Sequence, residues 1–353
     1  MASKDATAIT TDYPEVKPSD LIELGCALAK ARLPMLVIGK PGIGKSDIVE
    51  QIKATLGYRL IVSHPVVDDP IDYKGMPFTW MDKGSKCQKA GFLPFADLEL
   101  LIKATEPTIH FADDLGQAAK LTQAAYMQLM LNRSLNGHAV SDNVVFFAAS
   151  NRKEDKAGVG GMLEPLKDRY ATIVELTPDV DDWVGWAITN NMPFELISYV
   201  RYRPEILADW KPTSDFKRTA TPRSLAFVGK MMAAGIPSHL QRRAFTGAIG
   251  KERASEFIGF LGIYKDLPDP MDVILNPKSA PLPKDAAASY ALCGALSARA
   301  TTTTIEAIIE YSNRLKDEFS VLLVRDSIMR DRQGLCQNKG FITWVHKHQD
   351  VLI

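Results

Sequence analysis

Short apolar runs alternate with amphipathic segments along the first half of the chain. The runs that have the length and composition of buried strands lie at residues 32–38, 58–63, 108–112, 143–149 and 171–176. The segments between and before them that read as helices lie at residues 19–31, 47–56, 97–105 and 118–131. Strands that alternate with helices are typical of a parallel sheet covered by helices. The pattern predicts an α/β fold with a parallel five-stranded core and helices on both faces.

The pattern changes after Pro178. Residues 179–350 read as mostly helical, and prolines break them near positions 212, 222 and 237 and along residues 268–285. Within the first half, residues 64–94 are rich in Gly, Pro and Asp, which predicts an elaborated loop containing a hairpin. We therefore expect a core at 1–177 with an inserted loop at 64–94, a helical lid at 178–237, and a mostly helical C-terminal extension of unknown role at 238–353.

Composition narrows the class of protein. The chain is 46% hydrophobic and 24% charged, as folded soluble proteins are, and its 42 basic and 42 acidic residues give a formal net charge of zero. That balance offers no global electrostatic argument for binding nucleic acid or membranes. No apolar window is long enough to span a bilayer, and residues 1–18 lack the basic start and apolar run of a signal peptide. The four cysteines are far apart, which predicts reduced thiols in a cytoplasmic protein and neither zinc nor disulfides.

A phosphate-loop motif follows the first apolar run. Residues 39–46 read GKPGIGKS and match G-x-x-x-x-G-K-[ST] at every fixed position, with a predicted strand before them and a helix after them. Glycines let the loop wrap so that its amides and the helix N-terminus face phosphate oxygens. Lys45 is expected to reach the β and γ phosphates of ATP, and Ser46 to bind Mg²⁺. The nucleotide-binding residues are predicted to be Gly39, Pro41, Gly42, Ile43, Gly44, Lys45, Ser46 and Asp47.

Two aspartates end the third predicted strand. In a phosphate-loop enzyme a carboxylate at such a strand end holds the metal, which makes Asp113, with Ser46, the expected magnesium ligand. The next residue acts as general base toward the attacking water. In many such ATPases that residue is Glu, whereas here it is Asp114, one methylene shorter. The sequence therefore predicts either a reshaped site or slow turnover.

Polar and cationic residues near two later strand ends complete the candidate site. Asn151 follows the fourth strand, where an amide would hydrogen-bond the γ-phosphate and position water. Arg152, Arg169 and Arg223 are the candidates for stabilising charge in the transition state. Asn is also common in plain turns, and most arginines are solvated surface residues, so these residues have a purely structural interpretation as well.

Taken together, the motifs resemble those of AAA+ ATPases, and specifically the MoxR-like branch, also called the dynein-related AAA_5 group. The resemblance covers about residues 19–235 and rests on several ordered stretches. These are GKPGIGKS, VVDDPIDYKGMP, GFLPFADL, IHFADDLGQA, QAAYMQLMLNRSLNG, VVFFAASNR, LEPLKDRY and TATPRSL.

The resemblance implies a role for each matching residue. Residues 39–46 correspond to Walker A, Asp113 and Asp114 to Walker B, and Asn151 to sensor 1. Arg169 corresponds to the arginine finger that acts on ATP of a neighbouring subunit, and Arg223 to sensor 2 on the lid. Residues 64–94 resemble the loop that this branch inserts, and residues 133–142 the hairpin before sensor 1. Both would project toward a central channel or a partner. A ring, commonly a hexamer, is implied.

Three functions remain open from the sequence. The first is an ATP-driven remodeller or chaperone-like motor, which in this branch often works with a protein carrying a von Willebrand A domain. The second is a nucleic-acid motor, which the zero net charge disfavours. Basic residues do occur at 151–156 and 217–223, but they are mixed with acids or assigned to the ATP site. The third is an ATP-gated scaffold with very slow turnover, which Asp114 favours.

Overall fold

The computed structural model describes residues 13–82, 84, 87–155, 160–212 and 217–348. The chain divides into two compact units, Met1–Pro178 and Asp179–Ile353. Each is described by itself below. The expectation about a signal peptide at residues 1–18 falls mainly on residues 1–12, outside the described residues.

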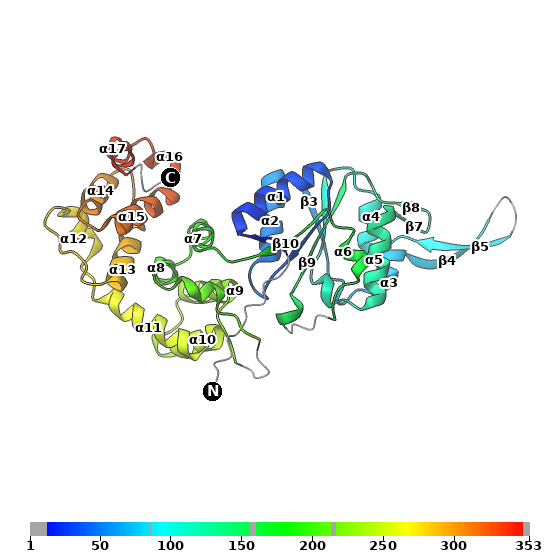
Figure 1. Ribbon diagram of the computed structural model, residues 1–353, viewed down its shortest axis with the longest axis horizontal. Coiled ribbons are helices and arrows are strands. Elements are labelled where there is room, and N and C mark those ends of the chain that lie inside the picture. The colour runs from blue at the N-terminus through cyan, green and yellow to red at the C-terminus, as the bar shows by residue number, and fades with distance from the viewer. Residues whose placement is uncertain (1–12, 83, 85–86, 156–159, 213–216, 349–353) are drawn as a thin grey trace, which may run out of the picture. The chain divides into compact units, whose positions relative to one another are not determined.

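A six-stranded parallel sheet forms the centre of the first unit (Figure 1). In spatial order its strands are β1 (Glu15–Val16), β10 (Thr172–Leu176), β2 (Met35–Ile38), β9 (Val144–Ser150), β6 (Thr108–Ala112) and β3 (Arg59–Ser63). The five predicted strands are all present. The prediction of five was one too few, because the two-residue strand β1 pairs with the edge strand β10. A strand this short has no hydrophobic pattern of its own.

Helices cover both faces of the sheet, as the alternation of strand side chains requires. Met35 and Val37 of β2 face one hydrophobic core, whereas Leu36 between them faces the other. The first core includes α1 (Pro18–Ala31) and α2 (Lys45–Leu56). The second includes α3 (Pro70–Lys74), α4 (Ala96–Ile102), α5 (Lys120–Asn132) and α6 (Glu164–Lys167). This α/β arrangement brings the carboxyl ends of all six strands to one edge.

Two antiparallel hairpins are added to the sheet. The longer pairs β4 (Met76–Met81) with β5 (Gln88–Leu93) inside the region 64–94, and it extends away from the sheet (Figure 1). The shorter pairs β7 (Ser134–Leu135) with β8 (His138–Ala139) inside residues 133–142. Asn136 and Gly137 connect these two strands with positive φ angles of 51° and 86°, a combination typical of a tight two-residue hairpin turn.

The second unit is helical in its described residues. Its helices are α7 (Val180–Thr189), α8 (Phe194–Tyr202), α9 (Pro222–Ala233), α10 (Ser238–Ile249), α11 (Lys251–Lys265), α12 (Pro270–Leu275), α13 (Ala286–Ser297), α14 (Ile305–Ser312), α15 (Asp317–Arg330), α16 (Arg332–Leu335) and α17 (Lys339–Lys347). Short 3₁₀ helices in the chain are Leu115–Gln117, Lys153–Asp155 and Pro204–Ala208.

One hydrophobic core crosses the boundary that we expect, from the sequence, between the lid and the extension at residues 237 and 238. It includes Val228 of α9, Phe245 of α10, Phe257 of α11 and Ala291 of α13. The lid and the start of the extension therefore share a core. Near the C-terminus, Trp344 is only 3% exposed and packs with α14 and α15, so this aromatic residue belongs to a core.

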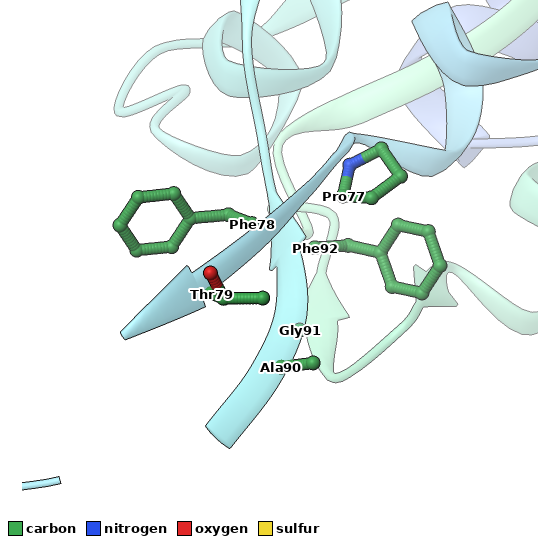
Figure 2. Close-up of a pocket in the computed structure, with 6 residues that line it drawn as sticks. All are labelled: Pro77, Phe78, Thr79, Ala90, Gly91 and Phe92. Atoms are coloured by element: carbon green, nitrogen blue, oxygen red, sulfur yellow. The ribbon is translucent and has the colours of Figure 1, made fainter. Parts of the chain in front are cut away.

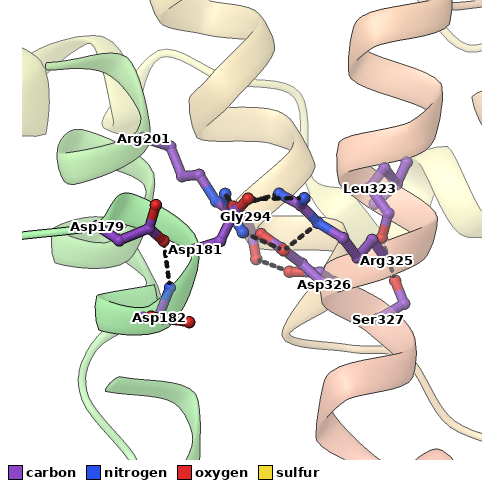
Figure 3. Close-up of polar contacts among 10 residues, drawn as sticks. Asp179, Asp181, Asp182, Arg201, Gly294, Leu323, Arg325, Asp326 and Ser327 are labelled. Carbon is purple, nitrogen blue, oxygen red and sulfur yellow. Dashed lines mark hydrogen bonds and ion pairs between the residues drawn. The ribbon is translucent and has the colours of Figure 1, made fainter. Parts of the chain in front are cut away.

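An ion network with a buried centre, Arg201 and Asp326, links helices of the second unit (Figure 3). Arg201 of α8 donates to Asp181 of α7 and, at 2.7 Å, to Asp326 of α15. Arg325 donates to the same Asp181 at 2.7 and 3.1 Å. The four residues thus connect the lid helices to the extension within this unit.

Two expectations from composition can be compared with the described residues. The four cysteines, at positions 26, 87, 293 and 336, are all free thiols. Among the described helices, none is both long and apolar enough to cross a lipid bilayer.

Candidate functional site

The loop at residues 39–44 connects β2 to α2 and has the backbone that its glycines allow. Gly42 and Gly44 have φ angles of 74° and 110°, in the region that side chains with a Cβ rarely adopt. A Cβ on Gly39 would lie 3.2 Å from the carbonyl oxygen of Leu176, so this position is also tight. The amide of Gly39 donates to the Ser150 carbonyl at 3.2 Å, which ties the start of the loop to β9. The sequence motif therefore corresponds to a wrapped loop ahead of a helix N-terminus.

Lys45 turns its side chain back toward this loop. Its Nζ donates to the carbonyl oxygens of Gly39 at 2.9 Å and Lys40 at 3.2 Å, and to Oδ1 of Asn151 at 2.7 Å. The residue is only 7% exposed. A buried ammonium group held by neutral oxygens is poised to take charged oxygens in their place.

Ser46 and Asp113 meet beside the loop. The Ser46 hydroxyl donates to Oδ2 of Asp113 at 2.7 Å. The amide of Asp113 donates to the Ser63 carbonyl at 3.0 Å, which fixes the end of β6 against β3. A hydroxyl and a carboxylate side by side supply the oxygen ligands that Mg²⁺ takes from proteins, the rest of its shell being water or phosphate. The described residues contain no cluster of three or more His, Cys, Asp or Glu side chains that would hold a metal alone.

Asp114 has an unusual backbone. Its φ of 57° lies in the left-handed region, which costs a residue with a Cβ roughly 1–2 kcal/mol and which Asp tolerates better than most. Its amide donates to Oδ1 of Asp113 at 3.1 Å. The chain thereby leaves the direction of β6, and Oδ1 of Asp114 accepts a hydrogen bond from Nδ2 of Asn151 at 3.2 Å.

Asn151 joins the parts of the site. One end of its amide accepts from Lys45 and the other donates to Asp114, and the residue is 8% exposed. Residues from the ends of β2, β6 and β9 are thus held in one hydrogen-bonded group. The sequence predicts that these residues approach one another, but it does not predict that the amide bridges the lysine and the second carboxylate.

The other predicted residues lie outside this hydrogen-bonded group. Arg169 follows α6, has a side chain 30% exposed, and contacts the adjacent Asp168 at 3.2 Å. Asp47 is exposed in the first turn of α2. Arg223 lies in the second unit, in the first turn of α9, where Thr221 and Ser224 cap the helix. The roles proposed for these three residues stay predictions.

The structure argues against Arg152 as a phosphate-stabilising charge. Its guanidinium donates to Asp155 at 2.7 and 3.1 Å and to Glu175 at 2.8 Å. The hydrogen bonds that Arg152 donates to Asp155 are the main reason that the pKa of Arg152 is raised, although burial opposes this shift. Because both carboxylates are buried, this arginine neutralises them and supports the strand ends.

Sequence reasoning missed the connection between the two hairpins. Asn136 Nδ2 donates to the Lys74 carbonyl at 2.8 Å, and Nε2 of His138 donates to the Phe92 carbonyl at 2.7 Å. The short hairpin therefore contacts the base of the long one, beside the start of β4 and the end of β5. The Asn136–Gly137 pair is a recognisable turn signal, but nothing local specifies its distant partners.

The long hairpin presents apolar side chains to solvent. Its exposed large hydrophobic residues are Met76, Phe78, Trp80, Met81, Phe92 and Leu93, each 40–64% exposed. The rings of Phe78 and Trp80 are stacked with centroids 6.0 Å apart, and Trp80 packs over Gly91. An open cleft of about 500 Å³ lies on this hairpin, lined by Pro77, Phe78, Thr79, Ala90, Gly91 and Phe92 (Figure 2). Such a patch on a projecting ribbon marks an interaction surface.

Comparisons with known proteins give fold-level likenesses only. No family model and no curated protein matches the chain. Among solved structures, the RuvB Holliday junction branch migration motor of Thermotoga maritima is similar at 14% identity and a TM-score of 0.39, over 80% of each chain. The replication initiator DnaA bound to AMPPCP and single-stranded DNA is similar at 14% identity and a TM-score of 0.38, over 94% of this chain and 88% of that one. At these values, family and activity must be argued from the chain's own residues.

Proposed function

We propose that this protein is a magnesium-dependent ATPase of the AAA+ class, of the MoxR-like branch, that works as a motor on a partner protein. One observation carries the proposal: Lys45, Ser46, Asp113, Asp114 and Asn151 meet at the carboxyl edge of the sheet through hydrogen bonds of 2.7–3.2 Å. They are the groups that phosphoryl transfer needs for binding, metal coordination and water activation.

Binding of ATP begins at the loop. The backbone amides of residues 42–44 and the N-terminus of α2 donate to the phosphate oxygens. Lys45 exchanges its carbonyl acceptors for charged β and γ oxygens, which form the stronger hydrogen bonds. Ser46 and Asp113 would hold Mg²⁺, which would supply positive charge to neutralise the phosphates.

Hydrolysis relies on the Asp114–Asn151 pair. Asn151 orients a water molecule, and the Asp114 carboxylate accepts a proton from that water as its oxygen bonds to the γ-phosphorus and the bond to ADP breaks. Asp114 is one methylene shorter than the usual Glu. The left-handed backbone, which turns Asp114 toward Asn151, is the reshaping that we propose compensates for this difference.

A ring assembly completes each site. Arg169 is partly exposed and outside the hydrogen-bonded group, which suits an arginine that serves the ATP of a neighbouring subunit in a ring, commonly a hexamer. Arg223 would contact nucleotide from the lid. Such an arrangement makes an isolated subunit a poor ATPase, because its own site lacks the stabilising charge.

The partner is proposed to meet the long hairpin. Its exposed aromatic and methionine side chains and the cleft at Gly91 support a protein ligand. A protein with a von Willebrand A domain is the expected partner. The hydrogen bonds from Asn136 and His138 connect this hairpin to the segment between Asp114 and Asn151, the route by which nucleotide would alter its position.

The central test measures phosphate release from ATP with Mg²⁺ or with EDTA, for wild type, Asp114→Asn and Asp114→Glu. We expect Mg²⁺-dependent turnover that Asp114→Asn abolishes and Asp114→Glu preserves or raises. ATP binding with negligible turnover in both the wild type and Asp114→Glu would instead identify an ATP-gated scaffold.

A second test addresses the partner. The double variant Phe78→Ser, Trp80→Ser should lose association with a purified von Willebrand A domain protein and keep its ATPase rate. Lys103→Ser on α4, exposed and away from the hairpin strands, is the control. Equal binding by both variants would remove the hairpin from the proposal.

A further inference from the structure

A basic stretch lies in the second unit of this electrically neutral chain. Residues 217–251 contain seven Lys and Arg and no Asp or Glu. Because the whole chain has 42 basic and 42 acidic residues, everything outside this stretch carries seven more acids than bases. The zero net charge therefore conceals a strong local asymmetry, and the absence of acids extends well past residues 217–223.

These seven cations are all exposed, and two of them differ from three arginines elsewhere in the same unit. Arg201, Arg253 and Arg325 each pair with a carboxylate at 3.1 Å or less. Within the described residues, Arg242 and Arg243 have no carboxylate at ion-pair distance. Unpaired neighbouring cations repel one another, so they are stabilised when an anion lies across them.

Arg242 and Arg243 are neighbouring exposed residues of α10. Phe245 and Ile249 of this helix are buried, at 0% and 1% exposure, and define its inward side. The exposed residues of this helix are Ser238, His239, Leu240, Arg242, Arg243 and Gly247. None of them is acidic, and the one large aliphatic side chain among them is Leu240, which is 37% exposed.

The side of α10 that carries Arg243 continues to the junction of α10 and α11. Arg243 and Gly250 are seven residues apart, which is two turns, so they lie on one side of the helix about 10 Å apart along its axis. The carbonyl oxygen of Arg218 lies so close to Gly250 that a side chain at position 250 would clash with it. The next residue, Lys251, is the first residue of α11. Cations thus occur at both ends of a row about 10 Å long, which matches roughly three phosphates of one strand of a duplex.

We propose that this basic face, defined as Arg218, His239, Arg242, Arg243 and Lys251, binds the sugar–phosphate backbone of a nucleic acid. Arginine forks suit phosphate oxygens, and the absence of acids removes repulsion along the row. A protein partner is less well matched, since the core of a protein interface needs several large apolar side chains and α10 exposes one, Leu240. Arg223 is left out because it is proposed for the nucleotide site.

The test is fluorescence anisotropy of labelled oligonucleotides, as single-stranded DNA, duplex DNA and RNA of one sequence, titrated with full-length protein. Salt is varied from about 50 to about 200 mM, the range over which phosphate contacts weaken. Nucleotide is omitted, so the result is independent of the ATPase. The variants are Arg242→Glu, Arg243→Glu and, as a control with the same charge change at two exposed lysines of this unit, Lys278→Glu, Lys284→Glu.

We expect wild-type binding that weakens with salt and that the arginine double variant reduces by tenfold or more, while the lysine control changes it by less than about twofold. Arg242→Gln, Arg243→Gln should lower the slope of log affinity against log salt by about two, one for each lost phosphate contact. The three oligonucleotides show which backbone is preferred.

Several outcomes would overturn the proposal. One is no binding of any oligonucleotide at low salt. Another is equal weakening by the arginine and lysine variants, which would indicate general charge and no defined face. Tighter binding of polyglutamate than of all three oligonucleotides would identify an acidic protein as the ligand. A melting curve by circular dichroism that matches the wild type shows that a variant is folded. If the glutamate variant is unfolded, the binding measured for the milder glutamine variant decides the test.

Discussion

The two units of the chain each contain a buried polar cluster, and the clusters are built differently. In the first unit, Lys45 donates to main-chain carbonyls and to an amide, all neutral. In the second, Arg201 lies between two carboxylates, Asp181 and Asp326, and is 8% exposed (Figure 3). The first cluster contains neutral acceptors that a charged ligand can replace, whereas the arginines of the second cluster are paired with carboxylates.

Ionisation reflects this difference. Burial raises the pKa of Asp326, and the neighbouring arginines only partly oppose it. Burial also acts to raise the pKa of Asp181, but hydrogen bonds and charge from Arg201 and Arg325 outweigh it, and its pKa is lowered. The second cluster is an internal connection between helices that no ligand needs to enter. The comparison teaches that a buried charge does not by itself identify a ligand-binding site. It matters more whether a ligand can replace the hydrogen-bond partners of that charge.

Lys45→Ala should have the largest effect, because it removes the ammonium group from the phosphate loop. We expect loss of detectable binding of a fluorescent ATP analogue in the presence of Mg²⁺. Lys53→Ala, an exposed lysine of the same helix, should bind like the wild type. Wild-type affinity in the Lys45 variant would count against the site.

Arg169→Ala should keep nucleotide binding and lose about 10³-fold in turnover, if it acts as arginine fingers do elsewhere. Lys167→Ala, two residues away, is the control. Mixing Arg169→Ala with Asp114→Asn subunits should restore part of the activity, because one neighbour then supplies the arginine and the other the carboxylate. No rescue at any ratio would mean that Arg169 acts within its own subunit or not at all.

Arg201→Met tests the second cluster. It leaves Asp326 buried with only a 3.9 Å contact to Arg325, and removing one partner of a buried pair typically costs about 3–5 kcal/mol. Urea unfolding should show this loss for the second unit. The double variant Arg201→Met, Asp326→Leu should recover part of it, because no charge is then left unpaired. Equal destabilisation by single and double variants would mean that packing, and not charge, holds these helices.

His110 gives the smallest predicted effect, in the core of the first unit. It is fully buried on β6, with Nε2 3.1 Å from the Ser63 hydroxyl, and burial lowers its pKa to about 4. The unfolded chain binds a proton near pH 6.5 that the folded chain does not, so stability falls as the pH drops from 7 toward 4. At pH 5 this amounts to about 2 kcal/mol.

The measurement compares the unfolding free energy of wild type and His110→Gln at pH 7 and pH 5. The variant should lose less stability than the wild type between these two values. His239→Gln, exposed on α10, should keep the wild-type slope. Identical slopes for wild type and His110→Gln would show that His110 does not titrate differently on folding.

Much of the first unit was determined by the sequence alone. The five long strands, the phosphate loop and the acidic end of β6 depend on local patterns, because alternating burial and glycine backbone freedom act over a few neighbouring residues. The same local information placed Lys45, Ser46, Asp113, Asp114 and Asn151 at strand ends. In a parallel sheet those ends share one edge, so the composition of the site followed from the order of the elements.

Only the tertiary structure decided the rest. Contacts between distant residues determine four features: the pairing of β1, the left-handed turn at Asp114, the amide bridge of Asn151, and the pairing of Arg152 with carboxylates outside the candidate site. Arg201 and Asp326 are 125 positions apart, and no local pattern indicates that they meet. Local sequence limits each segment to a few conformations, but the energy that selects among partners comes from burial, which exists only once the chain has folded.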